Sequence, residues 1–208
     1  LLSTVDGLLQ WDEQTMLPAA AGGFRAEQAA RLAAITHAQR TQKAQGERLE
    51  KLAASSLATN GPEVVQATIR LLHEDFQKQS RVPEKLVEEI ARTSIEAQQE
   101  WVAAVEASEW KKMVGHLEKM FSLKRELAAC QSPALDPYDA LMDDYEPGAR
   151  WRSVDSTFSK LRKALAPLVR GCFESTEGPQ DTALRGVFPL QAQQVFVRQI
   201  IEKIGFQF

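Results

Sequence analysis

Apolar residues recur at helical spacing along nearly the whole chain, and this periodicity restricts the fold more than any other feature. Val5, Leu8, Leu9 and Met16 share one side of a 3.6-residue helix near the start. Similar stripes follow in later segments, whereas the alternation that marks a β-strand is nearly absent. No motif recurs at a period of about 20–50 residues, as a solenoid would require. The sequence therefore predicts an all-α protein, an irregular array of long helices.

Alanine-rich segments and breaks divide this pattern into helices. Residues 24–52 are rich in good helix formers, and their small alanines permit close helix packing. This stretch predicts one long helix, or two with a break near Gly46. Two later stripes predict a helical hairpin that buries both Trp101 and Trp110.

The last third of the chain is expected to contain two further helices. Ser153 is expected to be the N-cap of the first, with an apolar stripe following it. Proline and glycine residues predict a loop over residues 174–189. Helical spacing resumes at Leu190.

Composition and charge exclude several classes of protein. Of the 208 residues, 44% are hydrophobic and 25% are charged, which is typical of a globular protein rather than a disordered one. A net charge of −3 gives no general attraction for nucleic acid. Cys130 and Cys172 are too few for a disulfide framework and predict reduced thiols. Because no apolar run approaches the ~20 residues of a membrane span, we expect a cytoplasmic protein with no nucleic-acid or membrane partner.

Residues 73–77 begin like the HExxH zinc motif but do not complete it. The motif needs two imidazoles four residues apart so that both reach one ion, and Gln77 stands where the second should be. We therefore interpret His73 as part of an ordinary amphipathic surface. His37 and His116 lie off the main apolar stripes and are expected at the surface or its boundary. The sequence predicts no metal ligands and no catalytic residues in this chain.

Two groups of charged residues need an explanation. Asp143, Asp144, Tyr145 and Glu146 stand directly before Pro147-Gly148, so a turn would project several carboxylates at once. These acids either bind a cation or a basic substrate, or fix the turn through backbone N–H groups and nearby arginines. Asp12 interrupts an apolar stripe and should be paired if it is buried. Arg25 and Arg31 are its candidate partners.

Several separated segments, in order along the chain, resemble the carboxypeptidase Taq family of metallocarboxypeptidases. Leu17 and Gln207 replace a methionine and an aspartate of the family pattern. The matching segments are Trp11-Asp12 with Thr15 and Pro18, Arg25-Ala26-Glu27-Gln28, Val82 to Ile90, Leu117-Glu118-Lys119, Leu123 to Glu126, Pro137 to Leu141, Asp144 to Gly148, Phe188-Pro189 with Gln193 and Phe196, and Gly205 to Phe208.

The resemblance implies a role for the chain within a larger enzyme. Such an enzyme would remove C-terminal residues from peptides with zinc or cobalt, held by an HExxH segment and a further glutamate that would lie beyond Phe208. Residues 1–208 would be its single helical N-terminal region, inactive without the missing C-terminal catalytic part. Asp144, Tyr145 and Glu146 would shape or brace the wall of a peptide groove. The resemblance also implies a homodimer.

Both ends of the sequence are expected to be truncated. The chain begins with Leu1, directly inside an amphipathic pattern, and ends on Phe208 without polar tapering. A different class of function is a stand-alone helical module that binds a peptide or protein without catalysis. That alternative predicts a natural stop soon after Phe208.

Overall fold

The computed structural model describes residues 1–175 and 185–206, and these residues form an all-α fold. Ten α-helices and one short 3₁₀ helix account for the described elements, and no described residue lies in a β-strand. The all-α prediction is therefore confirmed. No helix among the described residues is long and apolar enough to cross a membrane.

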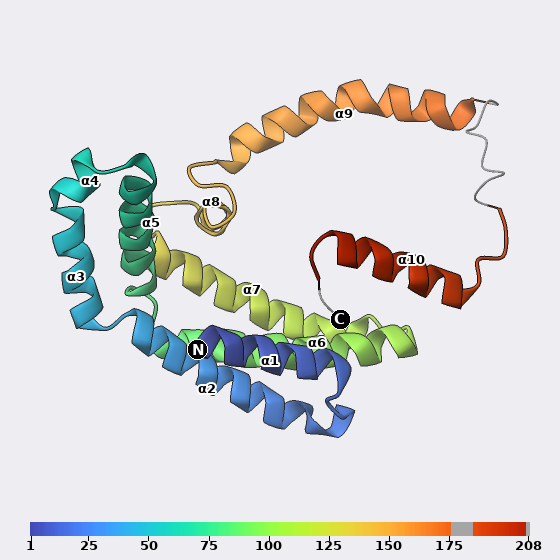
Figure 1. Ribbon diagram of the computed structural model, residues 1–208, viewed down its shortest axis with the longest axis horizontal. Helices are drawn as coiled ribbons and strands as arrows, with labels where there is room; N and C mark the ends of the chain where they lie inside the picture. Colours follow the sequence, from blue (N-terminus) through green and yellow to red (C-terminus); the bar gives the residue numbers. More distant parts are fainter. Residues whose placement is uncertain (176–184, 207–208) are drawn as a thin grey trace. The chain divides into compact units, whose positions relative to one another are not determined.

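The chain divides into two compact units, Leu1–Asp155 and Ser156–Phe208. The first unit contains α1 (Leu2–Thr15), η1 (Ala19–Ala21), α2 (Gly22–Arg40), α3 (Lys43–Ala53), α4 (Ser56–Asn60), α5 (Glu63–Gln79), α6 (Glu84–Ala107), α7 (Lys111–Gln131) and α8 (Pro137–Met142). The start of α9 (Trp151–Glu174) also belongs to it, whereas the rest of α9 and α10 (Leu190–Lys203) belong to the second unit. Figure 1 shows the order of these helices along the chain.

Helix α6 packs against both α2 and α7, and these three helices form the centre of the first unit (Figure 1). Gly22, Ala26, Ala30 and Ala34 follow one another at intervals of four along α2, and all are buried. A Cβ atom added to Gly22 would lie 1.9 Å from the side-chain amide oxygen of Gln99 on α6. Small side chains therefore let these helices approach closely, as the alanine-rich sequence predicted.

The expected break near Gly46 lies earlier in the chain. Helix α2 ends at Arg40 and α3 begins at Lys43, so Gly46 stands inside α3. A Cβ atom added there would lie 2.6 Å from the ring of Phe76 on α5. Gly46 is thus a place where an aromatic ring meets the helix backbone, and not a helix end.

Helices α6 and α7 form the predicted hairpin, but neither tryptophan is buried in it. Trp101 is 49% exposed and Trp110 is 66% exposed. The buried face of α6 is formed by Leu86, Thr93 and Ala104. A helix turns by about 100° per residue, so Trp101 lies about 60° from Ala104 and reaches the edge of this face. Trp110 precedes α7 at the hairpin tip, where Ser108 takes a left-handed backbone conformation with φ of 54°.

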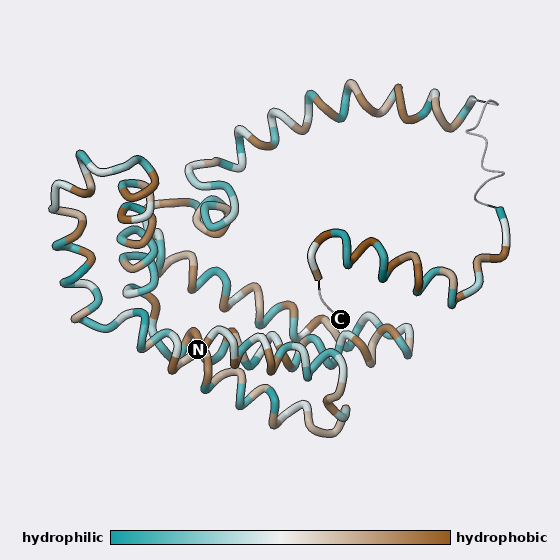
Figure 2. Tube along the Cα trace, viewed as in Figure 1, coloured by the Kyte–Doolittle hydropathy of each residue, from teal (hydrophilic) through white to brown (hydrophobic). Residues whose placement is uncertain are grey.

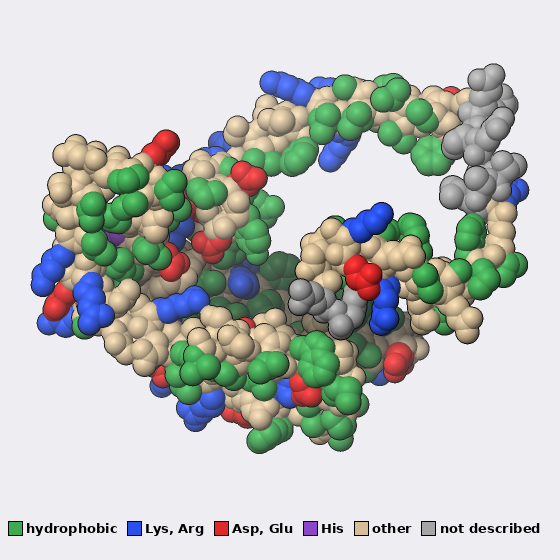
Figure 3. Space-filling view, in the orientation of Figure 1, with side chains coloured by type: hydrophobic (Ala, Val, Ile, Leu, Met, Phe, Trp, Pro, Cys, Tyr) green, Lys and Arg blue, Asp and Glu red, His purple; other side chains and the backbone are tan. Residues whose placement is uncertain are grey.

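Helices α9 and α10 are both amphipathic. Apolar residues recur along α9 at alternating intervals of three and four, from Phe158 through Leu161 and Leu165 to Leu168, and all four are exposed. Figure 2 shows hydrophobic segments recurring along both helices, and Figure 3 shows apolar side chains along one side of α9. The apolar faces within this second unit therefore remain available for packing.

The starts of α9 and α10 agree only in part with the helix boundaries predicted from the sequence. Helix α9 begins at Trp151, so Ser153 lies in its first turn and is not the residue before the helix. Helix α10 begins at Leu190, as predicted. Much of the expected loop over 174–189 lies outside the described residues.

Candidate functional site

The acidic turn at 143–148 is held by contacts at both oxygens of one carboxylate. Lys78, in the last turn of α5, places Nζ 2.6 Å from Asp143 Oδ2. The backbone N–H of Gly148 donates to Asp143 Oδ1 at 2.8 Å, across the turn. Lys78 also lies 3.6 Å from a carboxylate oxygen of Asp144. A single lysine thus fixes the turn to the end of α5.

The electrostatics of this contact favour the charged form of both partners. The hydrogen bond from Lys78, followed by the one from the Gly148 N–H, lowers the pKa of Asp143. The hydrogen bond to Asp143 raises the pKa of Lys78 against a smaller opposing effect of burial. The pair is therefore ionised at neutral pH and acts as an electrostatic brace.

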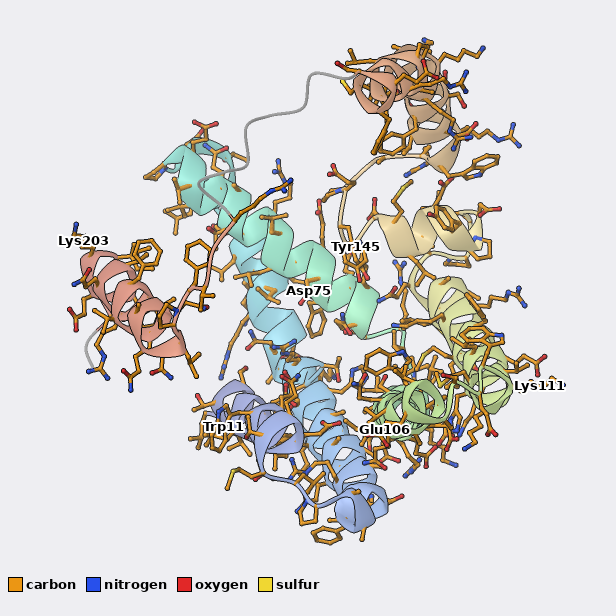
Figure 4. The ribbon with its side chains drawn as sticks, turned by 90° about the vertical axis from the view of Figure 1, so that its right-hand side faces the viewer. Trp11, Asp75, Glu106, Lys111, Tyr145 and Lys203 are labelled. Atoms are coloured by element: carbon orange, nitrogen blue, oxygen red, sulfur yellow. The ribbon has the colours of Figure 1, made fainter. Side chains whose placement is uncertain are left out.

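The backbone of the turn follows from its sequence. The N–H groups of Tyr145 and Glu146 both donate to the carbonyl of Met142 at 2.9 Å, which continues the end of α8. Gly148 then adopts φ of +80°, a conformation that glycine takes without steric cost. The Tyr145 side chain is 87% exposed. Figure 4 shows it on the turn beyond α8.

Asp139 is a second structural carboxylate, one whose role the residue pattern alone did not reveal. Its Oδ1 accepts a hydrogen bond of 2.6 Å from the backbone N–H of Trp151, and the residue is buried. The first N–H groups of a helix have no partner within it, so Asp139 satisfies one at the start of α9. Asp139 and Asp143 therefore fix the two ends of the segment that carries the acidic turn.

Asp12 contacts Arg25 rather than Arg31. The buried guanidinium of Arg25 on α2 donates to the Asp12 carboxylate and to the backbone carbonyl of Leu9, both on α1. Its Nε also donates to Gln28 Oε1 at 3.0 Å. Arg31 instead lies 3.5 Å from Glu88 of α6. One buried arginine thus ties α1 to α2.

A chain of ion pairs joins α2, α6 and α7. Arg92 of α6 donates to Glu27 of α2 at 2.7 Å and to Glu89 at 2.6 Å. Lys119 of α7 lies 2.5 Å from the other oxygen of Glu89. These contacts lower the pKa of both glutamates, that of Glu27 mainly through Arg92 and that of Glu89 mainly through Lys119. The network fixes the relative rotation of the three central helices.

An open cleft of about 910 Å³ lies in the first unit between the C-terminal half of α1 and helices α6 and α7. Its polar lining includes the carboxylates of Glu13, Glu96 and Glu100, the imidazole of His116 and several glutamine amides. Burial raises the pKa of Glu13, while Arg25 opposes that shift. Trp11, labelled on α1 in Figure 4, is 60% exposed. No residue of the acidic turn lines this cleft.

The histidines do not form a metal site in the part of the chain that the structure describes. His73 and Gln77 contact each other at 3.3 Å on the exposed side of α5. No group of three His, Cys, Asp or Glu side chains suited to a metal ion occurs among the described residues. His37, expected at the surface or its boundary, is instead buried. Its Nε2 lies 2.9 Å from the Val82 carbonyl, so it links α2 to the residues just before α6.

The family model described as carboxypeptidase Taq (M32) metallopeptidase matches residues 1–208. The chain belongs to this family. It is 29% identical to thermostable carboxypeptidase 1 of Thermus thermophilus, with 99% of the chain and 42% of that protein aligned. It is 23% identical to carboxypeptidase 1 of Bacillus subtilis, over 97% of the chain and 40% of that protein. The chain thus spans less than half the length of these curated relatives.

Solved structures agree with the fold of this carboxypeptidase Taq family chain. A crystal structure titled BsuCP covers the whole chain with a TM-score of 0.85 and 23% identity, and 41% of that protein is matched. The structure of the Pyrococcus furiosus carboxypeptidase covers the whole chain with a TM-score of 0.78 and 24% identity, again over 41% of its length. At these identities the likeness establishes the helical fold.

The segments that carry the family resemblance meet in the ion pairs described above. Arg25 and Glu27 come from one matching segment, Glu89 from the segment at 82–90, and Lys119 from the segment at 117–119. Arg92 lies outside the matching segments but supplies the opposing charge to Glu27 and Glu89, and Lys78, also outside them, lies 3.6 Å from Asp144. In this carboxypeptidase Taq family chain, these motif side chains join helices to one another.

Proposed function

We propose that this chain is the N-terminal portion of a metal-dependent carboxypeptidase that releases C-terminal amino acids from peptides. The supporting observation is a family match over residues 1–208 in a chain that spans only 40–42% of the two curated relatives described above. Separate support comes from the contacts at the matched motifs, which join helices. Such contacts suit a scaffold that supports a reaction carried out elsewhere in the protein.

The catalytic metal belongs to the missing C-terminal part in this proposal. Zinc or cobalt would be held by a segment beyond Phe208, and residues 1–208 would bind neither ion and hydrolyse no peptide alone. We further propose a cytoplasmic enzyme that acts as a homodimer. The complete protein, not this portion, would bind the peptide substrate.

Peptidase assays of the purified chain test whether catalysis requires the part of the protein beyond Phe208. Residues 1–208 are incubated with an N-blocked peptide and either zinc or cobalt, and released amino acids are measured by mass spectrometry. The complete protein serves as the positive control under the same conditions. We expect release by the complete protein only. Metal-dependent release by residues 1–208 would show that catalytic ligands lie within this chain.

The acidic turn and the Asp12–Arg25 pair have structural roles in this proposal. Asp144 and Gly148 complete a turn that Asp143 braces, and Pro147 restricts its backbone. Tyr145 and Glu146 are the side chains that this turn presents outward. The Asp12–Arg25 pair holds α1 against α2. None of these residues takes part in bond cleavage.

The exposed apolar face of α9 favours one alternative, a stand-alone helical module that binds a peptide or protein. The reading frame beyond the codon for Phe208 distinguishes the two functions. An in-frame HExxH segment with a downstream glutamate supports the carboxypeptidase portion. An immediate stop codon supports the binding module and would lead to a search for peptide partners.

A further inference from the structure

Tyr145 stands out because a rigid support carries an aromatic side chain that packs against almost nothing. Its side chain is 87% exposed, and it makes no hydrogen bond within the described residues. The adjacent Glu146 is also exposed and has no ion-pair partner among those residues. The first unit therefore gains little from either side chain.

The support beneath Tyr145 is built from contacts at three points. Lys78 and the Gly148 N–H hold Asp143, at 2.6 and 2.8 Å. The Met142 carbonyl accepts from the N–H of Tyr145 itself. Asp139 fixes the start of the following helix through the N–H of Trp151. A side chain presented this way loses little backbone entropy on binding, which favours a docking role.

Tyrosine is also one of the residues that most often dominate binding energy at interfaces. Its ring supplies a large apolar area with few rotatable bonds, and its hydroxyl adds one directed hydrogen bond. Glu146 beside it adds a negative charge at the rim. The partner surface should therefore offer an apolar pocket, a hydrogen-bond partner for the phenol and a nearby cation.

We propose that Tyr145 docks into a pocket on the catalytic portion of the same protein, with Glu146 facing a basic residue there. This inference rests on the proposed function. More than half the length of each curated relative lies outside the matched part, so a large covering surface is expected. The turn also lies directly before α9, through which the chain continues towards that portion.

The charges around Tyr145 argue against two other occupants. A carboxypeptidase substrate ends in a carboxylate, which Glu146 would repel. A second copy that docked this turn at a two-fold axis would place the same patch opposite itself and bring like charges together. The catalytic portion is under neither restriction, because its sequence can supply the complementary cation.

Tyrosine nitration of the complete protein tests the proposal. Tetranitromethane is applied to native and urea-unfolded protein, and peptide mapping gives the rate at each tyrosine. We expect native protection of Tyr145 by about tenfold or more, since reaction then requires local opening. Equal rates in the native and unfolded protein would overturn the proposal. So would protection that disappears when the protein is diluted to monomers, or that depends on added peptide.

Substitutions in the complete protein give a second readout. Tyr145→Ala should lower the melting temperature and speed proteolytic separation of the two portions, whereas Tyr145→Phe should retain most of the stability. Tyr138→Ala, at the other, 67% exposed tyrosine on α8, is the matched control. Equal behaviour of the Tyr145→Ala and Tyr138→Ala variants would refute the docking role. If the complete protein has peptidase activity but Tyr145 is nitrated as fast as in the unfolded protein, only the docking inference is refuted. If the complete protein has no peptidase activity but Tyr145 is protected, only the proposed function is refuted.

Discussion

Replacing Asp143 by asparagine should destabilise the first unit by about 1–2 kcal/mol at neutral pH. The amide oxygen of the asparagine can still accept from the Gly148 N–H, so the main loss is the charged contact with Lys78 Nζ at 2.6 Å. The side chains of Lys78 and Asp143 are 27% and 20% exposed, so solvent screens the pair only in part. A charged hydrogen bond contributes about 1.5–3 kcal/mol when buried, and this exposure reduces it. Urea unfolding followed by circular dichroism should show a midpoint lower by about 0.5–1 M.

The cost of the Asp143→Asn change should depend on pH in a defined direction. Folding lowers the pKa of Asp143. The contribution of Asp143 to the free energy of unfolding is therefore present above the pKa of its unfolded state and is lost as pH falls through the lowered value. Folding raises the pKa of Lys78. The contribution of Lys78 to the free energy of unfolding is therefore present below the pKa of its unfolded state and is lost as pH rises through the raised value. The stability difference between the two proteins should therefore be largest from about pH 5 to 9 and shrink on either side.

Asp144→Asn is the matched control for this experiment. Asp144 lies 3.6 Å from the same lysine but is 46% exposed, so its substitution should change stability by less than about 0.5 kcal/mol. A similar cost for both substitutions would show that general negative charge, and not the Asp143 contact, stabilises the turn. A cost at Asp143 that stays constant down to about pH 2.5, below the ordinary range of a carboxyl group, would refute the electrostatic explanation.

Four other substitutions test contacts elsewhere in the first unit. Gly46→Ala should lower the free energy of unfolding by about 1–3 kcal/mol, because the new methyl group would meet the aromatic ring of Phe76. Gly115→Ala is the control: its methyl group would meet no atom within 4 Å, so thermal melts should show a stabilisation of up to about 1 kcal/mol. Asp12→Asn should cost about 1–2 kcal/mol by removing the charge opposite buried Arg25, and an unchanged melting temperature would rule out that role. Glu89→Gln should cost about 0.5–1 kcal/mol at low salt and less at about 1 M salt; a salt-independent cost would contradict the ion-pair network.

Periodicity predicted the fold well because it reports which side of a helix is apolar. It identified the helical class, the close packing through alanines and the helix from Leu190. It did less well where two faces of one helix compete for burial. Trp101 was expected inside the hairpin, but small residues occupy the contact and the large ring remains at its edge.

The braces of the candidate site depend on partners that are distant in sequence, which local pattern analysis cannot supply. Lys78 is 65 residues from Asp143, and no spacing rule connects them. His37 was predicted to lie off the apolar stripes, yet it lies on the buried face of α2 with Ala30 and Ala34, and its ring is within hydrogen-bonding distance of the Val82 carbonyl. The partner of Asp12 was easier to predict from sequence, because a buried carboxylate on an apolar stripe requires a cation and the next helix contains two candidate arginines. The geometry then distinguished Arg25 from Arg31.

The distribution of charge in the first unit shows what several of the residues within the family match contribute to the fold. Asp12, Asp143 and Glu89 each meet a cation from another helix, so each contact fixes how two helices are rotated against one another. Apolar packing alone would tolerate small rotations, because alanine stripes offer few features that fix register. A scaffold that positions a groove or a docking turn needs this precision, since a displaced support misplaces every side chain on it. We therefore propose that Asp12, Asp143 and Glu89 act as alignment contacts.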